Sequence, residues 1–370
     1  MLWGNKRMRA ALIDGAVNLK FMESIQNPNV RMQGAYTVRD GEVTKESASA
    51  EGITHASVCA GIFLSEVQVP CELWCICVLK EHSLQGDIAS LLTALDFCRK
   101  QRMDVVSLSV GTTRIRDGGK LEPKIRELAD SGAIIVAAES NRRMLTFPAA
   151  MDQVIGVRED TLSNRRDFSN AILYRSRKRV FTYKGQSVVT GVYNSYAAPA
   201  VTAEVCGYLS GGITGTEQIR QRLKRLRNVR EGGSVRGGTL DKPVIFLDIR
   251  ENEKAVLCME KILDYFEQHE YEGVCISDTL RTDYAAGRLS IWQFAQGARG
   301  FKNRLISLTR AVNADFVIWH VAGQKTGRLC LREADLVVTD RTEQWRGWKK
   351  KKIFNTLDGE ALDRMRVYLE

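Results

Sequence analysis

Four short segments of the sequence carry side chains that could together perform acyl-transfer chemistry. Asp14 ends an apolar run, His55 heads a run of small residues (HASVCAG), Asn141 closes the segment AAESN, and Ser195 lies within YNSYAAP. A hydroxyl becomes a strong nucleophile when an imidazole takes its proton and a carboxylate orients that imidazole. An amide N–H can stabilise the oxyanion that forms after the attack.

The sequence context of these residues favours catalysis over a structural role. An aspartate at the end of a strand, or a lone histidine, is more often structural than catalytic. Asp14 follows a strand-like run, however, and the ligand sites of open α/β sheets gather at the carboxyl ends of strands. The chain has four histidines, and His55 is the one that lies in such a motif.

In this order along the chain, the four segments resemble the subtilisin-like serine peptidases over about residues 8–227. The run HASVCAG resembles the family's His-Gly-Thr-x-Val-Ala-Gly, and FPAAMDQVIGV resembles the family segment that follows the oxyanion asparagine. The resemblance implies that Asp14, His55 and Ser195 form a catalytic triad. It also implies that Asn141 and the Ser195 backbone N–H bind the oxyanion.

The same resemblance implies a set of substrate-binding residues. One segment would pair with the substrate backbone as an added strand, and a second would line the pocket for the residue before the cut. The residues of the first segment are Ser109, Val110 and Gly111, and those of the second are Ala138, Glu139 and Ser140. Arg142 also lies beside this pocket, and whether Arg142 or Glu139 faces the substrate stays open.

The sequence departs from the family pattern at several places. Gly15-Ala16 stands where the family has a small hydroxyl residue and glycine, and Ala56 replaces a glycine. Ser140 also replaces a glycine, and Tyr193-Asn194 replaces Gly-Thr. Because Tyr193 is much larger than glycine, we expect it to narrow or reshape the substrate cleft.

Short β-branched runs alternate with amphipathic stretches over residues 8–227, which is typical of a parallel sheet covered by helices. We predict an α/β fold with a subtilisin-like, doubly wound, mostly parallel sheet and helices on both faces. The strands are expected at 8–14, 72–79, 104–110, 133–138 and 153–157, the helices at 55–66, 86–101, 121–131 and 195–210, and loops at 117–119 and 158–170. A basic helix starting at Thr216 would close this region.

The Gly-rich stretch 231–238 reads as a flexible linker. We therefore predict a peptidase domain over 1–229, a linker over 230–242 and a smaller accessory, Rossmann-like α/β domain over 243–370. Expected strands are 243–248, 273–276, 316–320 and 336–339, and expected helices are 252–267 and 291–313, with a break at 297–300 left open.

The accessory domain resembles P-loop nucleotide-binding domains in outline only. At the end of this domain's first expected strand the sequence is DIREN, which lacks the glycines and the lysine of a phosphate-binding loop. The GQKTG segment at 323–327 contains such residues, but their spacing does not fit a phosphate-binding loop. A docking or dimerisation role is the better prediction. The aromatic and basic segment 345–354 could bind an acidic peptide or single-stranded nucleic acid, although a solvated charge run is more usual.

Composition narrows the class of protein. The chain has 370 residues with 44% apolar and 26% charged residues, and it contains neither an apolar run of about 20 residues nor a secretory signal. Nine cysteines lie mostly in apolar segments, which indicates reduced thiols and a cytoplasmic location. The spacing of Cys71, Cys75 and Cys77 does not fit a zinc site. No cofactor is predicted, and structural calcium stays open.

These observations predict a cytoplasmic serine endopeptidase that acts through an acyl-enzyme. The expected partner is a peptide or protein substrate, specifically a precursor whose leader peptide is removed. The net charge of +10 would attract an acidic leader, although a basic, solvated surface accounts for this charge equally well. The alternative is a catalytically impaired, peptide-binding module. Nucleic-acid binding is a third option and the least favoured, no membrane contact is expected, and the C-terminal domain could support an oligomer.

Overall fold

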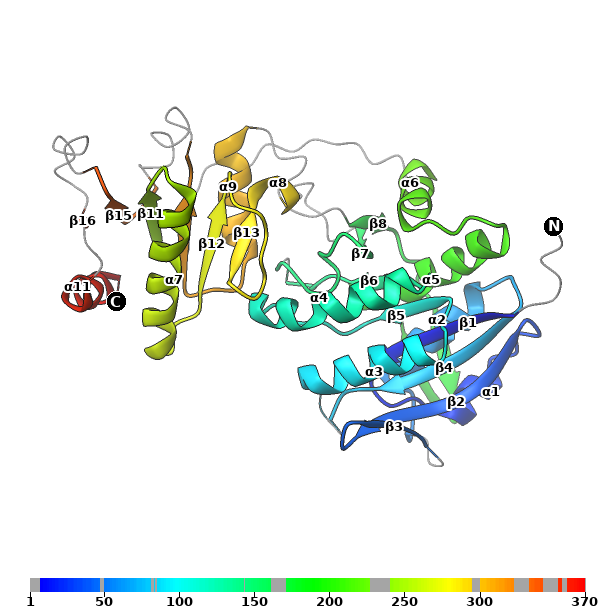
Figure 1. The fold of residues 1–370 in the computed structure, drawn as a ribbon. Helices are drawn as coiled ribbons and strands as arrows, with labels where there is room; N and C mark the ends of the chain where they lie inside the picture. The colour runs from blue at the N-terminus through cyan, green and yellow to red at the C-terminus, as the bar shows by residue number, and fades with distance from the viewer. Residues whose placement is uncertain are drawn as a thin grey trace. The chain divides into compact units, whose positions relative to one another are not determined.

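The computed structural model describes residues 7–46, 50–80, 83, 85–142, 144–160, 171–226, 240–294, 300–322, 333–341, 352–354 and 358–369. The chain divides into two compact units (Figure 1). The first comprises residues 1–112, 120–164 and 171–230, and the second comprises 113–119, 165–170 and 231–370. Each unit is built on its own sheet.

The first unit contains an eight-stranded sheet in the order β3-β2-β4-β1-β5-β6-β7-β8. All neighbouring strands are parallel except β2 and β3, which are antiparallel. The strands are β1 (Met8–Asp14), β2 (Val30–Arg39), β3 (Glu42–Lys45), β4 (Cys71–Cys77), β5 (Val105–Leu108), β6 (Ile134–Ala138), β7 (Val154–Glu159) and β8 (Ile172–Tyr174). The central strands are buried on both faces, as a parallel sheet requires.

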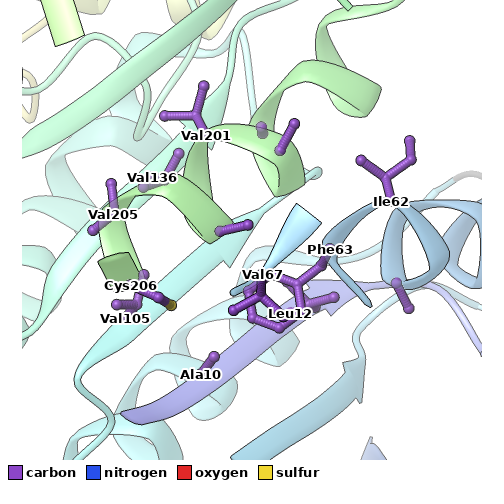
Figure 2. Close-up of a cluster of buried hydrophobic side chains, with 14 of the residues drawn as sticks. Ala10, Leu12, Ile62, Phe63, Val67, Val105, Val136, Val201, Val205 and Cys206 are labelled. Atoms are coloured by element: carbon purple, nitrogen blue, oxygen red, sulfur yellow. The ribbon is translucent and has the colours of Figure 1, made fainter. Parts of the chain in front are cut away.

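Two helices pack together on one face of this sheet and carry the residues of interest. They are α2 (His55–Glu66) and α5 (Asn194–Ser210). Figure 2 shows Ile62 and Phe63 of α2, Val201 and Val205 of α5, and Leu12 of β1 among the buried apolar side chains. Because α2 packs against α5, and α5 packs against β1, β5, β6 and β7, the starting points of the two helices are held with respect to β1.

The remaining helices of the first unit are α1 (Leu19–Ser24), α3 (Ile88–Lys100), α6 (Thr216–Leu226) and most of α4 (Ile115–Asp130), whose residues up to Gly119 are counted in the second unit. Figure 1 shows α3 and α4 in front of the sheet. The two-stranded antiparallel hairpin β9 (Val180–Tyr183) and β10 (Gln186–Val189) precedes α5.

Most elements expected from the sequence in this unit are confirmed, but the expected loop at 117–119 is wrong. Gly118 and Gly119 lie inside α4. Each interior glycine costs a helix about 1 kcal/mol. The burial of Leu121, Ile125 and Leu128 at helical spacing outweighs that cost. The expected loop at 158–170 is wrong at its start, because Arg158 and Glu159 continue β7, and residues 161–170 lie outside the described part.

The second unit contains a six-stranded parallel sheet in the order β13-β12-β14-β11-β15-β16. Its strands are β11 (Val244–Asp248), β12 (Gly273–Ser277), β13 (Arg288–Ser290), β14 (Phe316–His320), β15 (Leu336–Thr339) and β16 (Lys352–Phe354). Its helices include α7 (Asn252–Gln268), α8 (Ile291–Phe294), α9 (Phe301–Ala311) and α11 (Gly359–Leu369). The expected helix over 291–313 is therefore interrupted. Gly300 precedes α9 with a φ of 71°, a conformation that favours glycine.

His320 joins three strand ends of the second sheet. Its Nδ1 lies 2.9 Å from the Ser277 hydroxyl, and its Nε2 lies 3.0 Å from the Ile249 carbonyl oxygen. Burial lowers the pKa of His320, which favours the neutral ring that these two partners require. We therefore assign His320 a structural role.

Other expectations concern residues outside the described part. These are the linker at 231–238, the GQKTG segment at 323–327 and the basic aromatic segment up to residue 351. None of the helices in the described part combines the length and apolar composition needed to cross a bilayer.

Candidate active site

Asp14 lies at the carboxyl end of the central strand β1, with β4 on one side and β5 on the other. Its side chain is buried, with 4% of the residue exposed. The backbone N–H of Gly15 donates to its Oδ1 at 2.8 Å. The glycine that departs from the family pattern thus still supplies a backbone N–H that orients the Asp14 carboxyl group.

His55 is the first residue of α2, and the start of this helix is fixed by a hydroxyl network. Thr54 caps the helix, because its hydroxyl accepts from the Ser57 N–H at 3.0 Å and donates to the Ala16 carbonyl at 2.7 Å. The Ser57 hydroxyl accepts from the Asn18 N–H at 2.8 Å. These bonds tie the helix start to the loop after β1, so they orient His55 toward Asp14.

The three side chains form a continuous hydrogen-bonded chain. Nδ1 of His55 lies 3.0 Å from Oδ2 of Asp14, and Nε2 lies 2.9 Å from Oγ of Ser195. Ser195 lies in the first turn of α5, in sequence 140 residues after His55. A helix start presents free N–H groups and a positive dipole end, both of which favour a developing negative charge.

Comparison with known proteins gives a sequence match to a protease. The chain is 22% identical over 204 residues to the minor extracellular protease Epr of Bacillus subtilis (strain 168). The match covers 52% of this chain and 29% of Epr, so it spans less than a third of the relative's length. No protein-family model matches the chain.

Solved structures of peptidases are similar in part. The prenylagaramide maturation protease PagA has a TM-score of 0.43 at 16% identity, with 58% of this chain and 80% of PagA covered. A lanthipeptide protease has a TM-score of 0.45 at 14% identity, with 63% of this chain and 82% of that protease covered. The self-cleaved protease domain of PatA has a TM-score of 0.43 at 19% identity, with 58% of this chain and 86% of the PatA domain covered. Since these TM-scores are below 0.5, the similar structures carry no argument about the function of this chain.

The order of Asp14, His55, Asn141 and Ser195 and the sequence match make the chain similar to subtilisin-like peptidases. Asn141 contacts the residue that precedes Ser195 in the candidate active site, and its side chain is oriented by the backbone. The Asn194 N–H donates to Oδ1 of Asn141 at 2.9 Å, which leaves the Nδ2 donors of Asn141 directed elsewhere. Within the described residues, neither this Nδ2 nor the Ser195 backbone N–H has a hydrogen-bond acceptor. Two donors next to the nucleophile are what an oxyanion requires.

Asn194 is a buried residue whose importance the sequence analysis missed. Only 1% of it is exposed, and its Nδ2 donates to the carbonyls of Glu139 and Ser140 at 3.0 and 3.1 Å. Its Oδ1 accepts from the Glu159 N–H at 2.8 Å. It therefore joins the ends of β6 and β7 to the first turn of α5. The sequence showed it only as a departure from the family's threonine, and that departure was the available signal.

Tyr196 and Cys59 also contact the residues of the candidate active site. The Tyr196 ring stacks on the His55 ring, with centroids 5.3 Å apart and an interplanar angle of 23°. Cys59 lies one helical turn after His55, and its Sγ donates to the Ser195 carbonyl at 3.4 Å. Its Sγ forms, with Asp14 and His55, a group whose ligand atoms lie within 4.8 Å of one another. Burial raises the pKa of the Cys59 thiol well above its usual range, and the Asp14 charge adds to this effect, so the neutral thiol is favoured over the thiolate that metal binding needs.

The predicted substrate-binding residues surround Ser195 to different extents. The Ser109 hydroxyl lies 3.3 Å from the Ser195 carbonyl oxygen, so this residue reaches the site directly. Val110 and Gly111 follow β5 without joining a strand. Ala138 ends β6 and is buried, and the Ser140 N–H donates to the Thr146 hydroxyl at 3.0 Å.

Glu139 is placed differently from a residue that would select a basic substrate. Its side chain is buried, and its carboxylate pairs with the buried Arg158, whose Nε donates to Oε2 at 2.6 Å. Arg142 is exposed. The charge of Glu139 is thus neutralised by Arg158, and of the two candidate charges beside the pocket, Arg142 is the one open to solvent.

Breaking the buried Glu139–Arg158 pair is expected to destabilise the protein. Arg158→Met leaves a buried carboxylate without its cation, which costs about 3–5 kcal/mol of the free energy of unfolding. A Glu139→Leu/Arg158→Met double variant should recover most of that loss. Urea denaturation would measure both. The control is Arg126→Met, which removes the exposed pair with Glu122 on α4 and should cost less than about 0.5 kcal/mol. Equal losses for Arg158→Met and the control would contradict the expectation.

The pH dependence of activity is expected to follow His55. Burial alone lowers the pKa of His55, but the hydrogen bond and the charge of Asp14 oppose it, and the net pKa is raised. A general base must be neutral, so kcat/KM should fall as the pH drops through a value above about 6.5. In Asp14→Asn the burial remains without the carboxylate, so this acid limb should move to lower pH. A pH profile in which both proteins share one acid limb would contradict this assignment.

The same shift affects stability with the opposite sign. Because the pKa of His55 is raised by folding, the folded chain binds more protons than the unfolded chain in this pH range. This contribution to stability is fully present below about pH 6.5 and is lost as the pH rises through the folded pKa. Activity should therefore appear over the pH range in which this stabilisation disappears.

Proposed function

We propose that the chain is a serine endopeptidase of the subtilisin type, with Asp14, His55 and Ser195 as its catalytic residues. The observation that carries the proposal is the unbroken chain of hydrogen bonds from the Asp14 carboxylate through both ring nitrogens of His55 to the Ser195 hydroxyl. The sequence match to an extracellular protease supports the same chemistry.

The geometry supports a two-step hydrolysis. In the first step Oγ of Ser195 attacks the peptide carbonyl carbon while Nε2 of His55 takes the hydroxyl proton. The oxyanion that forms lies between the Ser195 N–H and the Asn141 side chain. His55 then gives its proton to the leaving amine as the C–N bond breaks. In the second step water, activated by His55, attacks the acyl-enzyme and releases the acid and the free Ser195 hydroxyl.

Asp14 has two functions in this scheme. It holds His55 with Nδ1–H directed at the carboxylate, so that Nε2 faces Ser195 as a base, and it stabilises the imidazolium that forms. Tyr196 restrains the same ring from its stacked face. We infer that the stacked tyrosine also favours the transient imidazolium, because a cation over an aromatic face is stabilised.

The proposed substrate is a precursor peptide whose leader segment is removed. Two of the similar structures carry names of this kind, a prenylagaramide maturation protease and a lanthipeptide protease. The net charge of +10 favours an acidic leader. The described cysteines are free, which is compatible with a cytoplasmic location. We further propose a peptidase domain over 1–229 and a Rossmann-like accessory domain over 243–370 that binds a partner or a second copy of the chain.

A fluorophosphonate probe tests the proposed function directly. Such a probe forms a covalent bond only with an activated serine, so the wild-type protein should be labelled once per chain, at Ser195. Ser195→Ala should show no labelling, although it should retain the circular dichroism spectrum of the wild type. A folded wild-type chain that is never labelled would contradict the peptidase and favour the non-catalytic peptide-binding module.

A further inference from the structure

Four exposed apolar side chains gather in the short stretch that leads to the nucleophile. Val180, Val189, Val192 and Tyr193 are exposed by 64%, 50%, 45% and 50%. The other large apolar side chains with comparable exposure in the described part belong to the second unit: Leu257, Trp292, Val367 and Tyr368. Exposed apolar groups that cluster, rather than scatter, mark binding surfaces. We call these four residues the hairpin face.

The hairpin face is the outer side of a firmly anchored element. In the β9–β10 register Phe181 pairs with Val188, and both face the core, where the Phe181 ring meets Phe21 edge-on at 5.9 Å. Val180 and Val189 form the next pair and face outward. Packing against the inner side fixes the hairpin, so the outward valine pair is presented on a rigid support.

The hairpin face is continuous with the candidate active site. Beyond Val189 the ladder ends at Thr190, whose N–H and hydroxyl both bond to the backbone of Arg179. Three residues, Gly191 to Tyr193, then connect it to α5. The Tyr193 ring meets the Tyr196 ring edge-on at 5.7 Å, and Tyr196 stacks on His55. Tyr193 therefore links the hairpin to the side chains around Ser195 through its contact with Tyr196.

Positive charge lies beside this apolar surface. Arg175, Arg177 and Lys178 are exposed and form no ion pair with a described residue. In contrast, Arg179 pairs with Glu66 at the end of α2 and is half-buried, so it anchors the hairpin instead. Apolar and cationic groups next to one another fit a peptide that carries apolar and acidic residues.

We propose that the hairpin face and the adjacent cations bind the substrate itself, through a segment that combines apolar and acidic side chains. This inference rests on the proposed peptidase function and specifies its substrate class. The apolar residues of the segment cover the valine pair and Tyr193, and its carboxylates meet Arg175, Arg177 and Lys178. The site thereby selects its substrate by contacts outside the triad, which leaves the chemistry at Ser195 unchanged.

The test compares wild type with a Val180→Ser/Val189→Ser variant and with a matched control, Leu257→Ser/Val367→Ser, which alters two equally exposed apolar residues in the second unit. Each protein digests the same randomised dodecapeptide library, and mass spectrometry identifies the cut peptides. Wild type and control should cut peptides enriched in apolar and acidic residues on one side of the cut. The hairpin variant should lose the apolar enrichment and show a KM about 10-fold higher for the best peptide, with kcat little changed.

A second variant tests the charged part of the surface. Arg177→Glu/Lys178→Glu should remove the acidic enrichment and weaken the dependence of KM on salt concentration, because fewer exposed charges remain to be screened. The hairpin's anchoring residues are untouched, so the fold is expected to persist in both variants.

The outcomes separate this inference from the proposed function. Labelling with a small fluorophosphonate, which is too short to reach the hairpin, should be the same in all variants. If wild type is labelled but both hairpin variants keep its peptide preference, the docking surface is disproved and the peptidase stands. If wild type is not labelled, the proposed peptidase function and the proposed substrate-binding surface are both disproved. A concentration-dependent dimer that Val180→Ser/Val189→Ser abolishes in analytical ultracentrifugation would show that a second copy occupies the face, and it would overturn the inference.

Discussion

Replacing either Ser195 or His55 with alanine is expected to lower kcat by about 10⁶-fold, and the double variant should be no slower than the worse single one. The reason is that the hydroxyl and the imidazole act as one unit, since Nε2 can remove the proton only because it lies 2.9 Å from Oγ. Once one member is missing, the other contributes nothing to the chemical step. The measurement is kcat on the best peptide from a library digest.

Asp14→Asn should have a smaller effect, about 10⁴-fold in kcat. It keeps the shape of the side chain but offers an N–H donor to Nδ1, so it stabilises the wrong tautomer of His55. The matched control for Ser195→Ala is Thr202→Val. It removes a buried hydroxyl of α5 whose hydrogen-bond partner among the described residues is the Ala198 carbonyl of the same helix. This control should keep wild-type kcat. A His55→Ala protein with near wild-type kcat would show that hydrolysis proceeds by a different route.

The residues that approach one another at the site could be named from the sequence, because each lies where an element begins or ends. Asp14 closes an uninterrupted apolar run, and His55 follows the cap residue Thr54. Such positions are fixed by local chemistry, apolar periodicity and capping. The hydrogen bonds that hold the site together were not predictable in the same way. Asn194 acts through carbonyls of residues more than 50 positions away, and only tertiary packing brings these groups together.

Parts of the fold were missed for a similar reason. The strand β2 is half-buried along most of its length and carries a bulge between Met32 and Gly34, so its pattern does not read as a buried strand. The β9–β10 hairpin turns at Lys184-Gly185, both with positive φ, between strands of only four residues each. Short amphipathic strands give a weak periodicity in the sequence, so these strands were not predicted. The glycines inside α4 had the opposite effect, because they predicted a loop where the chain is helical.

The last prediction concerns Asn194 as a positioning residue for the oxyanion donors. Its side chain bonds to the Glu139, Ser140 and Glu159 backbone, and its own N–H orients the Asn141 amide. Asn194→Asp keeps the size but replaces two N–H donors with a carboxylate oxygen beside two carbonyls. We expect this repulsion to shift the loop that carries Asn141 and to lower kcat by about 10²-fold, with KM nearly unchanged.

A double-mutant cycle distinguishes this role from a general loss of stability. Asn141→Ala alone should lower kcat by about 10²–10³-fold, because one oxyanion donor is removed. If Asn194 acts by positioning that donor, adding Asn194→Asp to Asn141→Ala should cost little more, since no donor remains to be misplaced. A residue that only supported the fold would give independent effects that multiply. Multiplying losses in kcat would therefore restrict Asn194 to a structural role, whereas losses that fail to multiply mean that the buried amide works through the Asn141 side chain.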